Sequence, residues 1–408
     1  MARGLLVGIA LWGAIIGWAA PVVELGVERF VASHAERLRG KGVAVLTHAA
    51  ARLPDGRLSL ELLVQHFRVV AVWAPEHGFW GTVPAGVPVQ DDTILGLPVY
   101  SLYGARRRPS AELFRGVEGV IVDLQDVGIR PFTYLSTLVL VMDACAERGV
   151  PVYVLDRPNP LGGIVVEGAV LDTAYRSFVG MLPIPYRHGC TLGELARMLN
   201  AEGWLPSSSH GTPRRCSLEV VPLRGWRRQM VWEDTGLPWF PPSPNVPTPT
   251  AARAMLLTGI LGEMGLWSVG IGTATPFQWL GAPGFPAGAV VERVRQRMAE
   301  LGVVVGTGRF VPSAGPYARQ ECHGIFFAPR PSAEARFLEA FVVLLEALWQ
   351  QSPQLCQQLT PKAQDMLRKV LGSEAALRAL CRGESLREWL EKGLGEFQRL
   401  RQRYSLYQ

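Results

Sequence analysis

Residues 43–74, VAVLTHAAARLPDGRLSLELLVQHFRVVAVWA, contain two short apolar runs on either side of a helical pattern. The runs 43–46 and 69–74 have the length and side chains of buried strands, and 58–66 repeats apolar residues at helical spacing. A helical pattern over 22–39 leads into the first run. A helix that leads into a buried strand, followed by a second such unit, is how a wound α/β sheet begins.

The same alternation continues along the chain, which predicts a parallel sheet with helices on both faces. The further segments are helical over 111–114 and 137–148, and strand-like over 119–124 and 152–155. With 408 residues the chain exceeds the roughly 250–300 residues at which a single core stops growing. We therefore predict an α/β chain of two domains.

The proline-rich segment 239–249, WFPPSPNVPTP, is unsuited to a helix or a central strand and marks the predicted domain junction. We expect a Rossmann-like parallel-sheet catalytic domain over 22–245. A smaller α+β domain follows over 246–408 and ends in amphipathic helices such as 385–403.

The N-terminus has the order of a signal peptide. Arg3 precedes an uncharged apolar stretch, 4–20, and the first acid is Glu24. This pattern predicts export to the periplasm or the exterior, with residues 1–21 as the leader. An uncleaved anchor that tethers the protein to the membrane is the first alternative, and a buried first helix is the second.

Composition and missing motifs exclude several classes of function. The net charge of +6 comes from scattered basic residues without interleaved aromatics, so no nucleic-acid partner is expected. Neither G-x-G-x-x-G nor a P-loop occurs, which argues against a nucleotide cofactor. The six cysteines form no C-x-x-C pair, so we expect no metal and favour buried free thiols over one or two disulfides.

Polar residues follow three of the predicted strands. These stretches are Pro-Glu-His-Gly at 75–78, Gln-Asp-Val-Gly at 125–128 and Asp-Arg-Pro-Asn-Pro at 156–160. Ligands of open α/β sheets bind outside the carboxyl ends of the strands. We therefore expect these three loops to meet on one rim.

Two glutamates are the candidate catalytic residues. Glu76 ends a strand among aromatic neighbours, where partial burial would favour the protonated form and suit the residue to donate a proton. Glu167 is a lone acid at the end of the apolar run 164–166. Glycoside hydrolysis needs two such carboxylates on either side of one bond.

The supporting polar set is Asp126, Arg130, Asp156, Arg157 and Asn159, which suit a sugar but could equally pair with one another. His77 and Tyr134 join them as substrate-binding candidates. His188 is either a ligand contact or a helix-start residue, because Thr191 and Glu194 behind it form a capping box. Ser243 and Asn245 are placed where they can reach a cleft. A serine hydrolase has little support, since no G-x-S-x-G elbow occurs.

Several of these motifs, in their order and spacing, resemble the exo-β-N-acetylmuramidase NamZ family (YbbC-like proteins). They are APEHGF at 74–79, GLPVYSLYG at 96–104, DLQDVG at 123–128, RPFTYLST at 130–137, LDRPNP at 155–160, Glu167-Gly168, FVG at 178–180, PIP at 183–185, HGCTLGEL at 188–195, SPN at 243–245 and YSLY at 404–407. The resemblance implies a cleft between two domains. It also implies release of N-acetylmuramic acid from non-reducing ends of peptidoglycan without metal or nucleotide, with Glu76 and Glu167 at the proposed catalytic positions.

One segment departs from the family pattern. Where the family carries E-G-T-N-x-S-x-G-R-G-T, this chain reads EMGLWSVGIGT at 263–273. The arginine is lost, and with it a partner for the lactyl carboxylate of muramic acid. Trp80, where the family often has Arg, points the same way.

We expect an exported glycosidase that acts on peptidoglycan or muropeptides. The first alternative is a related glycosidase or esterase with another sugar substrate, favoured if residues 264–271 line the cleft. The second is a cell-wall-binding protein that has lost catalysis.

Overall fold

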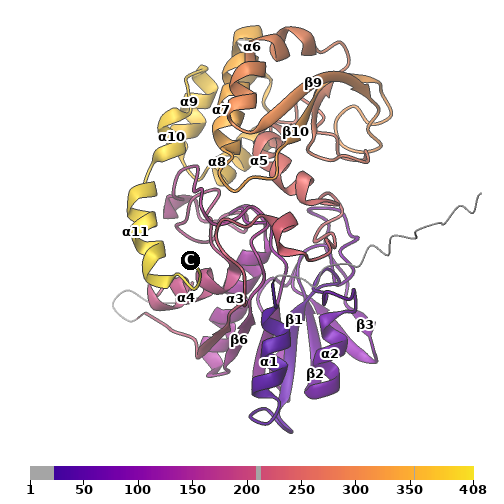
Figure 1. The fold of residues 1–408 in the computed structure, drawn as a ribbon, viewed down its shortest axis with the longest axis vertical. Helices are drawn as coiled ribbons and strands as arrows, with labels where there is room; N and C mark the ends of the chain where they lie inside the picture. Colours follow the sequence, from indigo (N-terminus) through magenta and orange to yellow (C-terminus); the bar gives the residue numbers. More distant parts are fainter. Residues whose placement is uncertain (1–22, 208–212, 353) are drawn as a thin grey trace, which may run out of the picture.

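The computed structural model describes residues 23–207, 213–352 and 354–408. The predicted leader, residues 1–21, lies outside the described residues. Two sheets organise the chain, one of seven strands in its first half and one of three strands in its second (Figure 1). This is the predicted α/β architecture of a Rossmann-like domain followed by a smaller α+β one.

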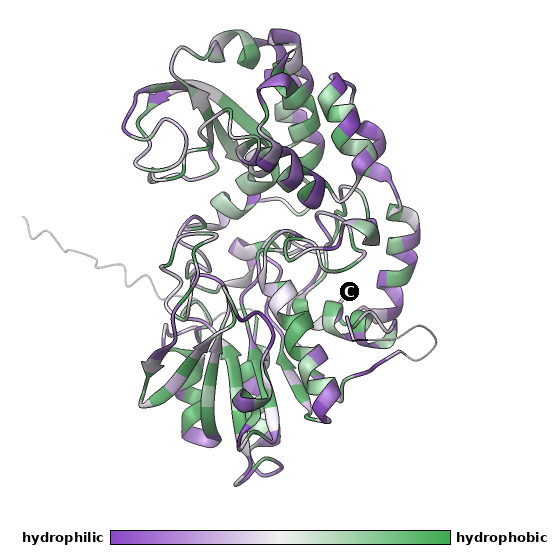
Figure 2. Cartoon of the chain, turned by 180° about the vertical axis from the view of Figure 1, so that it is seen from behind, coloured by the Kyte–Doolittle hydropathy of each residue, from purple (hydrophilic) through white to green (hydrophobic). Residues whose placement is uncertain are grey.

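The seven-stranded sheet has the order β3-β4-β2-β1-β5-β6-β7, and its pairs are parallel except for β3 with β4. Its strands are β1 (Gly42–Thr47), β2 (Arg68–Ala74), β3 (Asp92–Ile94), β4 (Leu97–Ser101), β5 (Gly119–Asp123), β6 (Val152–Leu155) and β7 (Leu218–Val221). Every residue of β1, β5 and β6 is buried, as expected for central strands of a sheet covered on both faces. Figure 2 shows these strands as mostly hydrophobic.

Two helices of this half have recognisable capping residues at an end. The helices are α1 (Gly26–His34), α2 (Ser59–His66), α3 (Tyr134–Arg148) and α4 (Leu192–Ala201), with short 3-10 turns η1 (Ala111–Phe114), η2 (Thr173–Tyr175) and η3 (Trp232–Thr235). Helix α3 ends where Gly149 adopts a φ of 67°. Helix α4 starts with the predicted capping box of Thr191 and Glu194.

The second half packs three antiparallel strands against helices. The strands, in the order β8-β10-β9, are β8 (Trp279–Ala282), β9 (Val303–Phe310) and β10 (Cys322–Pro329). Helix α6 (Ala287–Glu300) packs on these strands, and helix α7 (Phe337–Gln351) packs against α6 and the largely buried helix α5 (Pro249–Glu263). The proline-rich segment before α5 contains neither helix nor strand, as predicted.

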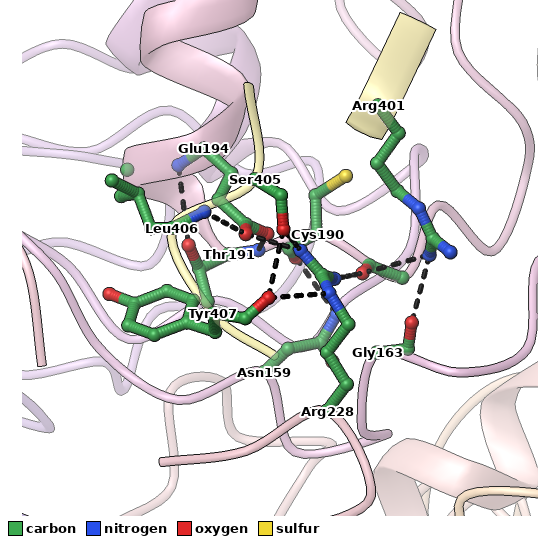
Figure 3. Close-up of polar contacts among 12 residues, drawn as sticks. Asn159, Gly163, Cys190, Thr191, Glu194, Arg228, Arg401, Ser405, Leu406 and Tyr407 are labelled. Carbon is green, nitrogen blue, oxygen red and sulfur yellow. Dashed lines mark hydrogen bonds and ion pairs between the residues drawn. The ribbon is translucent and has the colours of Figure 1, made fainter. Parts of the chain in front are cut away.

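The end of the chain returns to the first half. Turn η4 (Leu355–Gln358) and helices α8 (Pro361–Leu371), α9 (Glu374–Arg382), α10 (Arg387–Glu391) and α11 (Leu394–Tyr404) lead from α7 back to α4 (Figure 1). Arg228 donates hydrogen bonds to Glu194 and to Ser405, which follows α11 (Figure 3). The Tyr407 hydroxyl donates to Asp156. The last residues are therefore fastened to the strand ends of the first sheet.

The structure differs from the sequence-based prediction in several elements. Strands β3, β4 and β7 were not predicted as strands, and the predicted helix over 385–403 is broken near Gly393, which has a φ of 78°. All six cysteines are free, four of them buried, which agrees with the favoured prediction. Among the described residues, no helix is both long and apolar enough to cross a membrane.

Candidate active site

Asp156 and Arg157, in the loop after β6, are bonded to other groups of the protein. Asp156 accepts hydrogen bonds from the Thr191 hydroxyl at 2.6 Å and from the backbone N–H of Gly193 at 2.9 Å, while burial raises its pKa to about 6. Arg157 forms a bidentate ion pair with Asp123, with an Nη2 to Oδ2 distance of 3.0 Å. Both side chains are therefore occupied within the protein, Arg157 by Asp123 and Asp156 by residues at the start of α4.

Asn159 and His188 also face inward. The Asn159 amide donates to the Cys190 carbonyl at 2.9 Å and accepts from the Leu161 N–H at 3.0 Å. His188 accepts from the Cys190 N–H at 3.2 Å, and burial lowers its pKa to about 3. His188 is therefore neutral and contacts the segment before α4, while its buried Nε2 has no partner among the described residues, so its contact with a ligand stays a prediction.

The crevice outside these strand ends is too small for a sugar. One cavity, between Asp126, Arg157 and Asn159, has a volume of about 10 Å³, and a neighbouring one beside Gln125 is no larger. That volume holds about one water molecule. The rim where we expected the substrate is filled by the protein's own side chains.

Asp126 is the least satisfied carboxylate of this rim. Its Oδ1 accepts from the Gly128 N–H at 2.7 Å, while its buried Oδ2 has no partner among the described residues. Burial raises the pKa of Asp126 to about 7, from 3.8 for a solvated aspartate. The folded protein therefore holds this proton more tightly than the unfolded chain.

We expect Asp126→Asn to stabilise the protein in a pH-dependent way. Below about pH 4 the carboxyl is protonated in both states, so its ionisation costs nothing; between pH 4 and 7 the unfolded chain ionises first and the wild type loses stability. The advantage of Asn should grow to about 2–4 kcal/mol at pH 8. Denaturation of both proteins at pH 4.5, 6 and 8 measures it, with the exposed Asp92→Asn as control. A pH-independent difference would contradict the prediction.

Arg130 and Arg187 join the two halves from buried positions. Arg130 donates to the carbonyls of Ala169 and Ile184 in the first half, and to those of Val370 and Leu371 at the end of α8. The N–O distances range from 2.7 to 3.3 Å. All these acceptors belong to the backbone. The Arg130 guanidinium, predicted to bind the substrate, therefore donates its hydrogen bonds to the protein itself.

Glu167 lies with Arg187 at the start of α7. Its Oε2 accepts from Arg187 Nη1 at 3.1 Å and its Oε1 from the backbone N–H of Glu339 at 3.2 Å. Burial raises the pKa of Glu167, and the neighbouring Arg187 acts in the opposite direction. Both oxygens are occupied, and the contacts tie the first half to α7. That Glu167 is catalytic stays a prediction.

Glu76 is buried where three loops meet. Its Oε1 accepts from the backbone N–H of Gly86 at 2.9 Å, and its Oε2 from the hydroxyl of Thr133 at 2.6 Å. Burial, together with the nearby Glu76 carboxylate, raises the pKa of Tyr103 to about 12. Glu76 thus sits among neutral donors, with no cation bonded to it in the described chain.

His77 holds the loop that reaches Glu76. It has a φ of 71°, unusual for a residue with a side chain, and its ring Nδ1 lies 2.7 Å from the Val83 carbonyl. The Val83 N–H donates back to the His77 carbonyl at 3.2 Å. These contacts fold residues 78–86 over so that the Gly86 N–H points at the Glu76 carboxylate, which makes His77 a positioning residue.

One cavity of a size suited to a single sugar lies between the two halves. It has a volume of about 270 Å³, near the lower end of small-molecule sites. Its lining residues are Ala85, Pro131, Tyr186, Asn245, Met255, Gly259, Gly262, Glu263, Trp267, Ser268, Val269, Ile271, Phe277, Pro316 and Val370. Ala85 and Pro131 belong to the same two loops that hold Glu76, so the carboxylate stands just behind one wall of this cavity.

The remaining predicted residues surround this cavity unevenly. Asn245 lines it directly, whereas the Ser243 hydroxyl accepts from the Asn245 N–H at 3.3 Å and shapes the turn. The fully buried Tyr134 donates its hydroxyl to the Pro242 carbonyl. Tyr134 therefore connects the Glu76 loops to the proline-rich junction rather than facing the cavity.

Sequence reasoning missed Glu263, the acidic residue of the cavity lining. It is the only acid in α5 and stands at the end of an apolar run. That is the same signal that singled out Glu167. Tyr186, Trp267 and Phe277 were also missed as lining residues, because an aromatic side chain in the sequence fits a hydrophobic core as well as a cavity wall.

No group of three or more His, Cys, Asp or Glu side chains in the described residues is arranged to hold a metal ion.

Comparison with known proteins gives a consistent result over the whole described chain. The family model for the N-terminal part of exo-β-N-acetylmuramidase NamZ matches residues 43–250, and that for its C-terminal part matches 255–407. The peptidoglycan β-N-acetylmuramidase NamZ of Bacillus subtilis (strain 168) is 31% identical over 98% of both chains.

Two solved structures of DUF1343 family proteins from Bacteroides fragilis have the same fold. One matches with a TM-score of 0.87 and 33% identity, over 96% of this chain and 100% of its own. The other matches with a TM-score of 0.73 and 30% identity, over 95% and 99%.

Proposed function

The chain belongs to the exo-β-N-acetylmuramidase NamZ family, and from this membership we propose that it releases terminal N-acetylmuramic acid from the non-reducing ends of peptidoglycan chains or fragments. The observation that carries the proposal is the interdomain cavity of about 270 Å³, bounded by the loops that hold Glu76. A site of that size suits one terminal sugar rather than a run of them, which fits an exo-acting enzyme.

Glycoside hydrolysis supplies the chemical logic for Glu76. One carboxyl group protonates the leaving oxygen, and a second activates water or attacks the sugar. Glu76 is buried and bonded only to neutral donors, so its charge is not neutralised by a cation. We propose that it is one of the two groups.

A second candidate, a glycosidase for an uncharged terminal sugar, is favoured by the cavity lining. Trp267, Ser268, Val269 and Ile271 come from the segment that departs from the family pattern, and they line the cavity. The lining contains no Lys, Arg or His to pair with a lactyl carboxylate, and its acid, Glu263, would repel one when ionised. An N-acetylglucosaminide would avoid that cost.

A panel of 4-nitrophenyl β-glycosides separates the two candidates. A higher kcat/KM on the N-acetylmuraminide than on the N-acetylglucosaminide supports the muramidase, and the reverse order supports the second candidate. Retention on insoluble peptidoglycan without hydrolysis of either glycoside would identify a binding protein without catalysis.

Filling the cavity should abolish activity without unfolding the protein. Gly259 lines the cavity in the middle of α5, and an added Cβ would meet ordinary contacts, with Met255 Cγ at 3.4 Å. We expect Gly259→Phe to lower kcat/KM at least 100-fold, while Gly259→Ala stays within a few fold. Neither variant should melt below the wild type, since glycine is the weaker helix former. Full activity of Gly259→Phe would place the substrate elsewhere.

The proposed substrate also bears on location. Peptidoglycan lies outside the cytoplasmic membrane, so we propose that the enzyme is exported by the apolar leader and works in the periplasm or the exterior. Mass determination of the protein purified from the envelope fraction, with or without residues 1–21, tests this and distinguishes a cleaved leader from a tether.

A further inference from the structure

Glu263 is a carboxylate that the fold does not use. It is the last residue of α5, and its side chain lines the interdomain cavity. No hydrogen bond or ion pair joins the Glu263 side chain to any residue in the described part of the chain. Its side chain is open to solvent, yet the surrounding protein raises its pKa, a combination expected of a group on the wall of a cleft.

The position of Glu263 is unfavourable for helix stability. The last turn of a helix carries a partial negative charge, so an acid there costs a few tenths of a kcal/mol up to about 1 kcal/mol, and a basic residue is preferred. In the part of the chain that the structure describes, no ion pair joins Glu263 to a basic side chain, and the Arg253 of the same helix is paired with Glu233. An unpaired acid at a helix end, facing a cavity, is better explained by chemistry than by folding.

The other two glutamates differ from Glu263 in the state of their oxygens. Both oxygens of Glu167 are bonded, one of them to the Arg187 guanidinium. Both oxygens of Glu76 accept from neutral donors of the N-terminal half, the Gly86 N–H and the Thr133 hydroxyl. Glu263 lines the cavity at the end of α5, and Glu76 lies behind the wall to which Ala85 and Pro131 contribute, in the two loops that hold its carboxylate.

The cavity around Glu263 favours a carboxyl group that keeps its proton. Tyr186, Trp267 and Phe277 supply apolar walls, and the lining has no basic side chain. A bound anionic sugar would further disfavour ionisation of Glu263.

We propose that Glu263 is the proton donor of the reaction and the second catalytic carboxyl group beside Glu76; this rests on the glycosidase function proposed above. The Glu263 proton passes to the glycosidic oxygen while the bond from that oxygen to the anomeric carbon breaks, and the electron pair of the bond stays on the leaving oxygen. The anomeric carbon takes the oxygen of a water molecule, whose proton passes to the Glu76 carboxylate. Solvent returns both groups to their starting states.

The test uses the full-length protein and two substrates that differ in their need for a proton. The disaccharide of N-acetylmuramic acid and N-acetylglucosamine has a poor leaving group, whereas 4-nitrophenyl β-N-acetylmuraminide has a good one. We expect Glu263→Gln to lower kcat on the disaccharide about 10²–10⁴-fold and on the nitrophenyl glycoside less than tenfold. The alkaline limb of the kcat pH profile should also disappear.

Two variants serve as controls. Glu292→Gln, at an exposed position of α6, should change neither activity nor melting temperature. Glu167→Gln should lower the melting temperature, because it breaks the buried pair with Arg187. Glu263→Gln should melt with the wild type, since its side chain has no partner to lose.

The outcomes separate the two proposals. Disaccharide hydrolysis by Glu263→Gln within tenfold of wild type, or an equal loss on both substrates, overturns the role of Glu263 and leaves the glycosidase function standing. If the wild type cleaves only the N-acetylglucosaminide, the same leaving-group comparison is made with that sugar. If it cleaves no glycoside, the function and this inference both fail.

Discussion

Replacement of Glu76 by Gln should lower kcat by about 10³-fold or more, the loss expected when an acid–base group is removed from a glycosidase. The amide can keep both local hydrogen bonds, with its oxygen accepting from the Gly86 N–H and its nitrogen donating to the rotatable hydroxyl of Thr133. The fold should therefore survive while the ionisable group is lost. Steady-state kinetics on the muramyl disaccharide, with the melting temperature measured in parallel, give the result.

The Thr133→Val variant is an informative partner for Glu76→Gln. It removes one donor to the carboxylate but leaves the carboxylate in place, so its kcat should fall much less and its pH profile should shift. Activity of Glu76→Gln within tenfold of the wild type would remove Glu76 from the mechanism.

Replacement of Arg130 by Met should destabilise the protein by about 3–5 kcal/mol, the size of effect seen when one partner of a buried charged interaction is removed. The guanidinium is buried and bonded to four backbone carbonyls, two in each half of the molecule. Methionine fills a similar volume but donates nothing, so those carbonyls lose their partner without gaining water. Two of them end α8, where a cation is also favoured by the helix dipole.

Chemical denaturation of Arg130→Met measures this loss, with Arg295→Met on the exposed face of α6 as the matched control. The control should unfold with the wild type. If Arg130→Met also unfolds with the wild type, the four hydrogen bonds do not hold the two halves together.

The sheet of the first half was predictable because its strands carry a strong local signal. Residues 43–46, 119–124 and 152–155 are continuous apolar runs, and each became a fully buried central strand. Edge strands have only one neighbour and carry a weaker pattern. Strand β7 (Leu218–Val221) is only partly buried, and β3 (Asp92–Ile94) has three residues, so neither stands out from a loop in the sequence.

The return of the chain end was not predictable from local patterns. The Tyr407 hydroxyl bonds to Asp156, and Leu406 N–H donates to Glu194 at 2.9 Å (Figure 3). Both contacts join residues more than two hundred positions apart. They add partners to a capping box and to a strand-end turn, and nothing in the local sequence of either indicates that such a partner is needed. Asp156, which was predicted to bind the sugar, accepts a hydrogen bond from the end of the chain instead.

The roles of the acidic residues near the cavity could not be predicted from local sequence patterns either. A lone acid after an apolar run is a valid signal, but it occurs at both Glu167 and Glu263, and only the fold reveals which of them has an arginine beside it. Neighbours in space, not in sequence, decide whether a carboxylate is structural or exposed to a ligand.

The segment that departs from the family pattern has a clear place in the structure. Residues 267–271 contribute four of the residues that line the cavity, and Gly270 between them takes a φ of 79°. An apolar, cation-free wall changes what the enzyme can bind more than how it is folded. Restoring a cation with Ile271→Arg should therefore raise selectivity for a sugar that carries a carboxylate.

The most direct test is to incubate the purified wild-type protein with the disaccharide of N-acetylmuramic acid β-linked to N-acetylglucosamine and to identify the products by mass spectrometry over time. We predict equal amounts of free N-acetylmuramic acid and N-acetylglucosamine, formed by the wild type and not by the Glu76→Gln variant. An intact disaccharide after long incubation with folded wild-type protein, or equal release by the Glu76→Gln variant, would contradict the account.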